Sequence, residues 1–193
     1  ATVSGASAEL AGLTTAGTDL IAVTLSDAHT LPQLKAINNA TGGQITLNSV
    51  SVALSGTSAD VAAALDGSFA ASYTGDVSLT DVHDLPQLKA INAGTSGDIT
   101  LFSSTAALSG SAADITAGLT GISGYAGAVT ASGTQTGSAG VTAVNALGTA
   151  TAGVVTATVS GTAAELASLT TAGTDMIAVT VSNAHDLAKL KAI

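Results

Sequence analysis

The sequence predicts an α/β solenoid in which repeats of about 52 residues stack parallel β-strands, with short helices along one side. Three observations predict this class: a long internal repeat, segments in which apolar and hydroxyl residues alternate, and helical segments with one narrow apolar stripe. Only 2% of the 193 residues are aromatic, and no Trp is present. A thin interior filled by Ala, Val, Ile and Leu explains this composition, because a large ring would need a matching void in every neighbouring repeat.

The repeat appears when the start of the chain is compared with its end. Residues 2–37 align without gaps on residues 158–193, with 27 identities in 36 positions. A Ser-Gly pair begins each of four units, which start near residues 4, 55, 109 and 160. We therefore expect a single repeat array over residues 1–193, with about 3.7 units, excerpted from a longer array. One unit could form one wide coil or two coils of about 26 residues, and we favour two.

Each unit is expected to contain strand, helix, strand, helix and strand. In the strand segments Val and Ile alternate with Ser and Thr, which is typical of strands with one buried face. These segments are residues 21–26, 76–80, 128–132 and 177–182, and a second set at residues 45–47, 99–101 and 154–156.

The helices of each unit carry apolar residues at helical spacing, so each has one side suited to packing on a sheet. With two to three turns, such helices need that support to be stable. The first helix of each unit contains Leu10/Leu13, Val61/Leu65, Ile115/Leu119 or Leu166/Leu169. The second contains Leu31/Leu34/Ile37, Leu85/Leu88/Ile91, Val141/Val144/Leu147 or Leu187/Leu190/Ile193.

Acidic residues recur at one position of the repeat, as Glu9, Asp60, Asp114 and Glu165. A ladder of carboxylates could bind calcium between coils. However, three of the four end a Ser/Thr-x-x-Asp/Glu pattern, which is typical of a helix N-terminus, and only Glu9 lacks it. We therefore expect helix capping rather than metal binding.

Histidines recur just before the second helix, as His29, His83 and His185. Aligned histidines suggest zinc binding or a pH switch. They are a full unit apart and no Cys or Glu pattern completes a metal site, so we expect turn histidines. Their neighbours Thr30, Asp84 and Asp186 are the expected helix caps.

Two further residue types recur in the second helix. Lys35, Lys89 and Lys191 are expected near its C-terminus, where a cation is favoured. Pro32 and Pro86 fit its first turn, where a missing amide costs little.

The composition excludes several classes of function. Four Lys against thirteen Asp and Glu give a formal charge of −9, which leaves no basic surface for nucleic acid. The longest apolar run is about five residues, whereas a transmembrane helix needs roughly 18 or more. Neither a nucleophile elbow nor a phosphate loop is present. We therefore assign no catalytic, cofactor-binding or metal-binding residue and expect neither a cofactor nor an enzyme.

Paired hydroxyl residues align on one set of strands. If this face points outward, it forms a regular array such as ice-binding solenoids use, although Ser replaces one Thr in every pair. The pairs are Thr24/Ser26, Ser78/Thr80, Thr130/Ser132 and Thr180/Ser182.

Residues 159–169 and 84–93 resemble repeats of very large secreted surface proteins of cyanobacteria and some proteobacteria, often described as haemolysin-type or adhesin-like. The resemblance implies export, a cell-surface location, and a structural or adhesive role. We therefore expect a non-enzymatic extracellular filament, sheath or adhesin shaft, formed by head-to-tail self-association or by continuation of the same chain. A binding module with an ice-binding or adhesive Thr/Ser face is the alternative.

Overall fold

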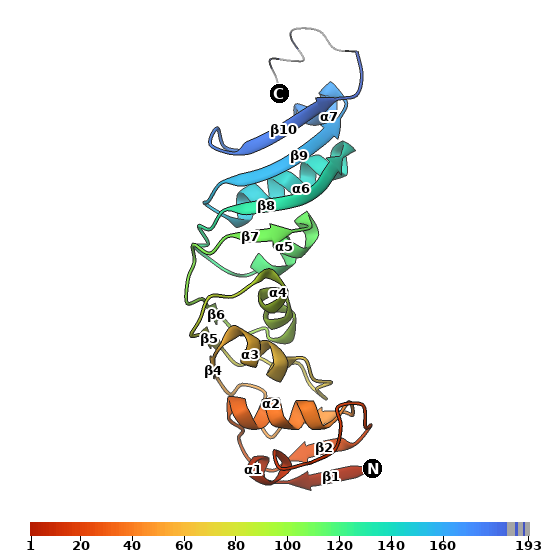
Figure 1. Ribbon diagram of the computed structural model, residues 1–193, viewed down its shortest axis with the longest axis vertical. Helices are drawn as coiled ribbons and strands as arrows, with labels where there is room; N and C mark the ends of the chain where they lie inside the picture. Colours follow the sequence, from red (N-terminus) through yellow and green to blue (C-terminus); the bar gives the residue numbers. More distant parts are fainter. Residues whose placement is uncertain (185–187, 189–190, 192–193) are drawn as a thin grey trace. The chain divides into compact units, whose positions relative to one another are not determined.

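The computed structural model describes residues 1–184, 188 and 191, and it contains two compact units, Ala1–Ser103 and Ser104–Ile193. Each unit is considered by itself. In both, short helices alternate along the chain with parallel β-strands (Figure 1). The α/β class and the parallel pairing expected from the sequence are therefore confirmed.

The first unit contains two three-stranded parallel sheets, with strand orders β1-β2-β3 and β4-β5-β6. Its strands are β1 (Thr2–Gly5), β2 (Ala22–Leu25), β3 (Ile45–Thr46), β4 (Leu54–Gly56), β5 (Val77–Leu79) and β6 (Ile99–Thr100). Its helices are α1 (Ser7–Leu10), α2 (Leu31–Ala40), α3 (Ser58–Leu65) and α4 (Leu85–Gly94). Each helix contacts the next one along the chain.

The second unit, within its described residues, contains one parallel sheet of order β10-β9-β8-β7. Its strands are β7 (Leu108–Gly110), β8 (Val129–Thr136), β9 (Val155–Gly161) and β10 (Met176–Val181). Its helices are α5 (Ala112–Leu119), α6 (Gly137–Ala150) and α7 (Ala163–Leu166). The register shifts between Thr130 and Thr134, where β8 bulges against β9.

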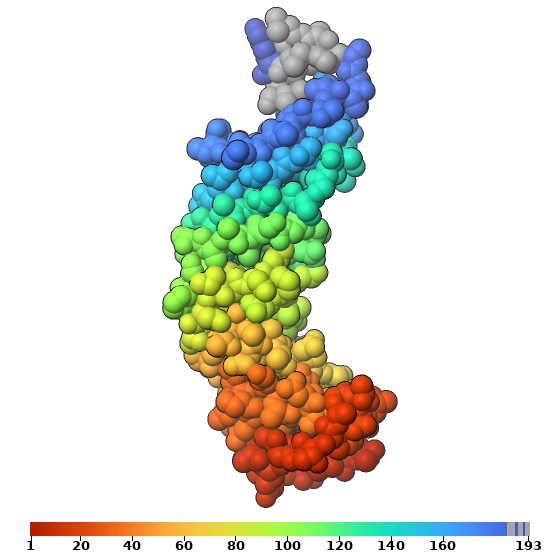
Figure 2. Space-filling model, viewed as in Figure 1, coloured from red at the N-terminus to blue at the C-terminus, as the bar shows by residue number. Residues whose placement is uncertain are grey.

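Strand partners are close together in sequence. They are separated by 20 residues in the Thr2↔Ala22 pair and by 26 in the Val129↔Val155 pair. This spacing is about half of the 52-residue repeat seen in the sequence. Within each unit, Figure 2 shows the colours following one another in sequence order, as local pairing requires.

The core lies between the inner face of the strands and the helices. Alternate strand residues, such as Val23, Val77 and Val129, are fully buried. The expected helix stripe is buried as well, and Leu34 and Ile37 of α2 are inaccessible to solvent. The period-2 and helical patterns therefore identify the buried faces of these elements correctly, whereas Val179 of β10 is exposed. The predicted stripe Leu187/Leu190/Ile193 lies outside the described residues.

Two details of the helices differ from the expectation. Helices α1 and α7 have only four residues each. Where α3 continues with alanines, α1 is followed by Gly12 and α7 by Ser168, each with threonines soon after, and these residues favour a helix less than Ala does. Lys35 and Lys89 lie in the middle of α2 and α4, which extend to Ala40 and Gly94, so the expected position near the helix C-terminus is wrong.

Candidate functional site

The outer face of the strands carries files of hydroxyl groups. In the first unit Ser4, Thr24 and Thr46 are paired across β1, β2 and β3, and all three are exposed. Further files are Ser55–Ser78–Thr100, Ser109–Thr130–Thr156 and Thr136–Ser160–Thr180. Because paired strands are about 4.8 Å apart, each file repeats a hydroxyl at that spacing.

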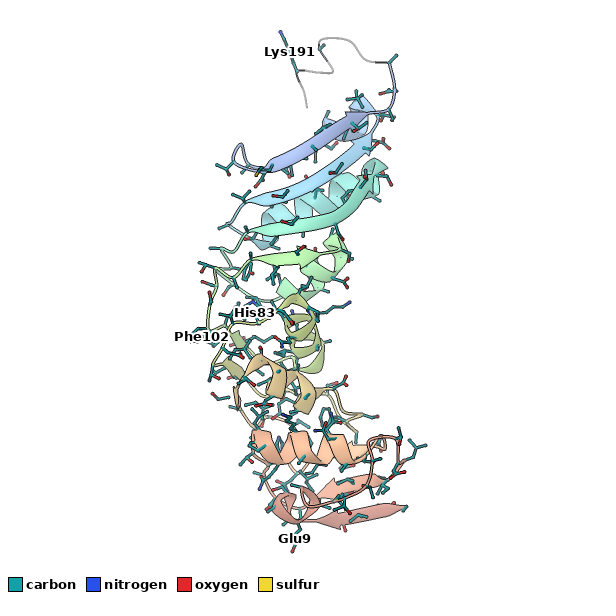
Figure 3. The ribbon with its side chains drawn as sticks, in the orientation of Figure 1. Glu9, His83, Phe102 and Lys191 are labelled. Carbon is teal, nitrogen blue, oxygen red and sulfur yellow. The ribbon has the colours of Figure 1, made fainter. Side chains whose placement is uncertain are left out.

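The expected second column of hydroxyls is interrupted. Ser26, Thr80, Ser132 and Ser182 are exposed, as an outward face requires. However, Asn48 donates from Nδ2 to the carbonyl oxygen of Ser26 at 3.1 Å. Phe102, which follows β6, is 62% exposed and is labelled in Figure 3. The first column is regular within each sheet of the first unit, whereas in the second unit the register shift in β8 puts Thr130 and Thr180 in different files. The second column is irregular.

The recurrent carboxylates lie in the first turns of α1, α3, α5 and α7, where the expected caps form. Thr57 Oγ1 accepts from Asp60 N at 3.2 Å, and Ser111 Oγ accepts from Asp114 N at 3.1 Å. Glu165 Oε2 accepts from Thr162 N at 2.8 Å, and this backbone hydrogen bond is the main cause of a lowered Glu165 pKa. Glu9 and Glu165 thus accept from backbone amides at helix N-termini, whereas Asp114 accepts from the Ser111 hydroxyl.

Asp60 has a second partner, because Lys35 Nζ donates to its Oδ1. The hydrogen bond from Lys35, followed by the one from Thr57, lowers the Asp60 pKa. The lysine thus ties α2 to α3.

A second set of caps, which the sequence analysis missed, joins neighbouring strand layers. Asp27 Oδ1 accepts from Ser7 N at 2.7 Å, and Asp81 Oδ1 accepts from Ser58 N at 2.7 Å. Asn183 Oδ1 accepts from Ala163 N at 2.9 Å in the second unit. Each acceptor follows a strand and caps the helix of the preceding layer. The recurrence of Asp, Asp and Asn at one repeat position was the available signal.

A buried threonine directly after each of α2, α4 and α6 was also missed. Thr95 Oγ1 donates to Gly75 O at 2.8 Å and accepts from Gly97 N at 3.0 Å. Thr151 makes the same contacts with Gly127 O and Gly153 N, at 2.7 and 2.9 Å. Thr41 is the third member and is 3% exposed. The Thr-x-Gly pattern in the sequence marks these staples, which bind a carbonyl of the preceding strand layer.

His29 and His83 lie in the loops just before α2 and α4, as expected, and their side chains are buried in the core. His29 and His83 are 3% and 4% exposed, and burial lowers the pKa of both. His29 Nε2 lies 3.0 Å from the hydroxyl of Tyr73, which donates to Val52 O at 2.5 Å. Because the Tyr73 proton is committed to Val52, His29 Nε2 is the donor. His185 and Asp186 lie outside the described residues.

Tyr73 and its repeat counterpart Tyr125 are buried exceptions to the small-residue core. Tyr125 donates its hydroxyl to Ala106 O. Burial raises the pKa of each tyrosine to about 12. In the first and last repeats Asp19 and Asp175 occupy the same position as these tyrosines. The alignment of the repeats therefore gave no sign that the two tyrosine rings fill the core.

Two clefts in the first unit lie near the C-terminal ends of its helices, with volumes of about 370 and 390 Å³. Their polar groups hold the chain together: Asn38, beside the second cleft, donates to Ala63 O at 2.7 Å. Within the described part of the chain, no three His, Cys, Asp or Glu side chains are grouped so as to hold a metal ion. No described helix has the length and apolarity needed to cross a bilayer.

Comparison with known proteins adds no relative: no protein-family model, no curated protein and no solved structure matches this chain.

Proposed function

We propose that this chain is a non-enzymatic structural repeat protein, an α/β solenoid whose stacked coils form a filament, sheath or adhesin shaft outside the cell. One observation carries the proposal: the same parallel pairing recurs about half a repeat apart in all three sheets. This spacing fits two coils per 52-residue unit and a single array over residues 1–193. Because each coil buries its apolar side on its neighbours, the architecture suits a structural element.

The polar residues of the repeat support a mechanical role. The threonine staples and the Asp27 and Asp81 caps connect successive layers by buried or half-buried hydrogen bonds. Glu9, Asp27, Asp81 and Glu165 accept hydrogen bonds at helix N-termini, and His29 and His83 are buried in the core. The side chains that recur are therefore those that hold one layer on the next.

Self-association follows from the edges of the sheets. Among the described residues, β1 and β10 are edge strands of their sheets. An edge strand presents unpaired amides and carbonyls to another strand. We infer that these edges support head-to-tail stacking, or are covered by further repeats where the chain continues.

Sedimentation velocity over a concentration series tests this proposal. We expect the average sedimentation coefficient to rise with concentration. Ser4→Pro should suppress the rise, because Pro removes an amide of β1 that alternation directs toward the open edge. Ser4→Ala is the matched control and should stack normally. A concentration-independent monomer for the unaltered chain would contradict the proposal.

The extracellular and adhesive parts of the proposal rest on the resemblance of residues 159–169 and 84–93 to secreted surface repeats. An exposed face rich in hydroxyls and a net charge of −9 suit a solvated exported surface. Fractionation of the source cells, with an antibody against the chain, tests the location. Detection only inside the cells would overturn it.

An ice-binding face is the second candidate, favoured by the in-register hydroxyl files. Thr130→Lys would place a charged side chain on the file of β7–β9 and should abolish any thermal hysteresis. Thr149→Lys, on exposed Thr149 of α6, is the matched control. The candidate fails if the unaltered chain shows no thermal hysteresis.

A further inference from the structure

The edge strand β10 repeats the sequence of a strand that is fully paired elsewhere in the chain. Residues 173–180 differ from residues 17–24 at one position only, Met176 in place of Leu20. In the first unit, β2 lies between β1 and β3. In the second unit, β10 has β9 on one side and is the last strand of its sheet among the described residues. The environment of β2 therefore shows what fits the open side of β10.

The segment that covers β2 is residues 41–46. Thr41 Oγ1 donates to the carbonyl oxygen of Ile21 at 2.6 Å and accepts from the amide of Ile21 at 3.2 Å. Gly42 N donates to Asp19 O at 3.0 Å, and Val23 N donates to Gln44 O at 2.9 Å.

Two side-chain requirements make this segment specific. Gly43 must lack a side chain, since a Cβ there would collide with the carbonyl oxygen of Ile21. Thr41 must supply a hydroxyl, because Gly43 N also donates to its Oγ1, at 2.9 Å. A Thr-x-Gly sequence meets both requirements.

Every group that receives this segment has a counterpart at β10. Asp175, Ile177 and Val179 match Asp19, Ile21 and Val23. The counterpart surface is open: Val179 is 38% exposed, whereas Val23 is completely buried.

We propose that the outer edge of residues 175–180 is an acceptor site for a strand with the pattern Thr-Gly-Gly-x-Ile-Thr, carried by another chain of the same repeat sequence. The strand binds parallel to β10, with its Ile opposite Val179 and its second Thr opposite Thr180, as Val23↔Ile45 and Thr24↔Thr46 pair in the first unit. This inference rests on the proposed stacking function and names its partner strand.

The test uses the full chain, labelled with ¹⁵N, and a synthetic peptide of residues 40–48. Saturating peptide should slow amide hydrogen exchange at Ile177 and Val179 by about tenfold or more, because these amides gain acceptors. The amide of Val23, which is already paired, should not change. Exchange at Ile177 and Val179 that is unaltered by the peptide overturns the acceptor site.

Two altered peptides serve as controls. The peptide with Thr41→Val lacks the hydroxyl, and the peptide with Gly43→Ala carries the colliding Cβ, so neither should protect β10. Equal protection by all three peptides would overturn the specific register.

The same experiment separates this inference from the proposed function. If the chain forms filaments but the peptide does not protect β10, the acceptor site is wrong and the stacking function remains. If the peptide protects β10 but the chain never associates, the acceptor site remains and the stacking function fails.

Discussion

Buried threonine hydroxyls join the strand layers, and Thr41 shows how much one of them contributes. In Thr41→Val the shape is kept, but Gly43 N and the carbonyl of Ile21 lose the Thr41 hydroxyl as their partner. Leaving such groups unsatisfied costs about 1–3 kcal/mol. We expect the free energy of unfolding of the first unit to fall by that amount.

Tyrosine fluorescence measures this loss during urea unfolding. In a Tyr125→Phe background, Tyr73 is the one remaining tyrosine and reports on the first unit. Thr46→Val, which removes an exposed hydroxyl, is the control and should change stability by no more than about 0.5 kcal/mol. Equal stability of the two variants would show that the staple contributes nothing.

The buried histidines should make the first unit sensitive to mild acid. Burial lowers the pKa of His29, and also that of His83 against the opposing effect of Asp84 and Asp81. Below the ordinary pKa of 6.5, the unfolded chain therefore takes up protons that the folded chain does not. The stability that depends on the neutral buried histidines is present above pH 6.5, and it is lost as the pH falls below that value.

Thermal melting between pH 7.5 and about 5 checks this sign, because this range lies above the reference pKa values of carboxyl side chains, about 4. We expect the melting temperature of the first unit to decrease toward pH 5. The double variant His29→Gln/His83→Gln should remove most of the decrease. A melting temperature that rises toward pH 5, or an unchanged slope in the variant, would contradict this role.

At the scale of the elements, side chains from one strand layer begin the helices of another. Asp81 accepts from the first amide of α3, and the chain uses Asn183 for the same task at α7. Asp81→Asn should therefore be tolerated, whereas Asp81→Ala should cost about 1 kcal/mol, as the loss of an N-cap does. Urea unfolding followed by Tyr73 fluorescence compares the two. Equal destabilisation by both would mean that the charge, rather than the accepting oxygen, matters.

The elements that repeat most regularly were the ones best predicted from the sequence. The alternation around Val23 and the spacing of Leu34 and Ile37 depend on local periodicity, so the strands and buried helix faces were found correctly. Helix ends were less predictable: α2 continues to Ala40, where Thr41 binds a distant carbonyl. Such contacts connect residues about 20 apart in sequence, and no local pattern fixes them.

The candidate surfaces were predicted in part, for a similar reason. Exposure of Thr24 and Ser26 followed from alternation. Phe102 interrupts the hydroxyl column, and Tyr73 and Tyr125 fill the core. All three are individual residues that depart from the repeat. A repeat alignment averages over such departures.

At the scale of the whole chain, the composition follows from repeated local pairing. Strands pair with partners only 20 to 26 residues away, so small apolar residues suffice inside and hydroxyls suffice outside. Several of the acids that give the charge of −9 accept hydrogen bonds at helix N-termini, and such caps recur with the repeat. Among the described residues, β1 and β10 are edge strands with one unpaired side, and the proposed stacking would occur there.

Electron microscopy of the purified chain over a range of concentrations tests the central claim most directly. We predict filaments that lengthen as the concentration rises, with a strand-to-strand repeat of about 4.8 Å in their diffraction. Separate single particles at every concentration, without filaments, would contradict the proposal that this chain is a stacking structural module.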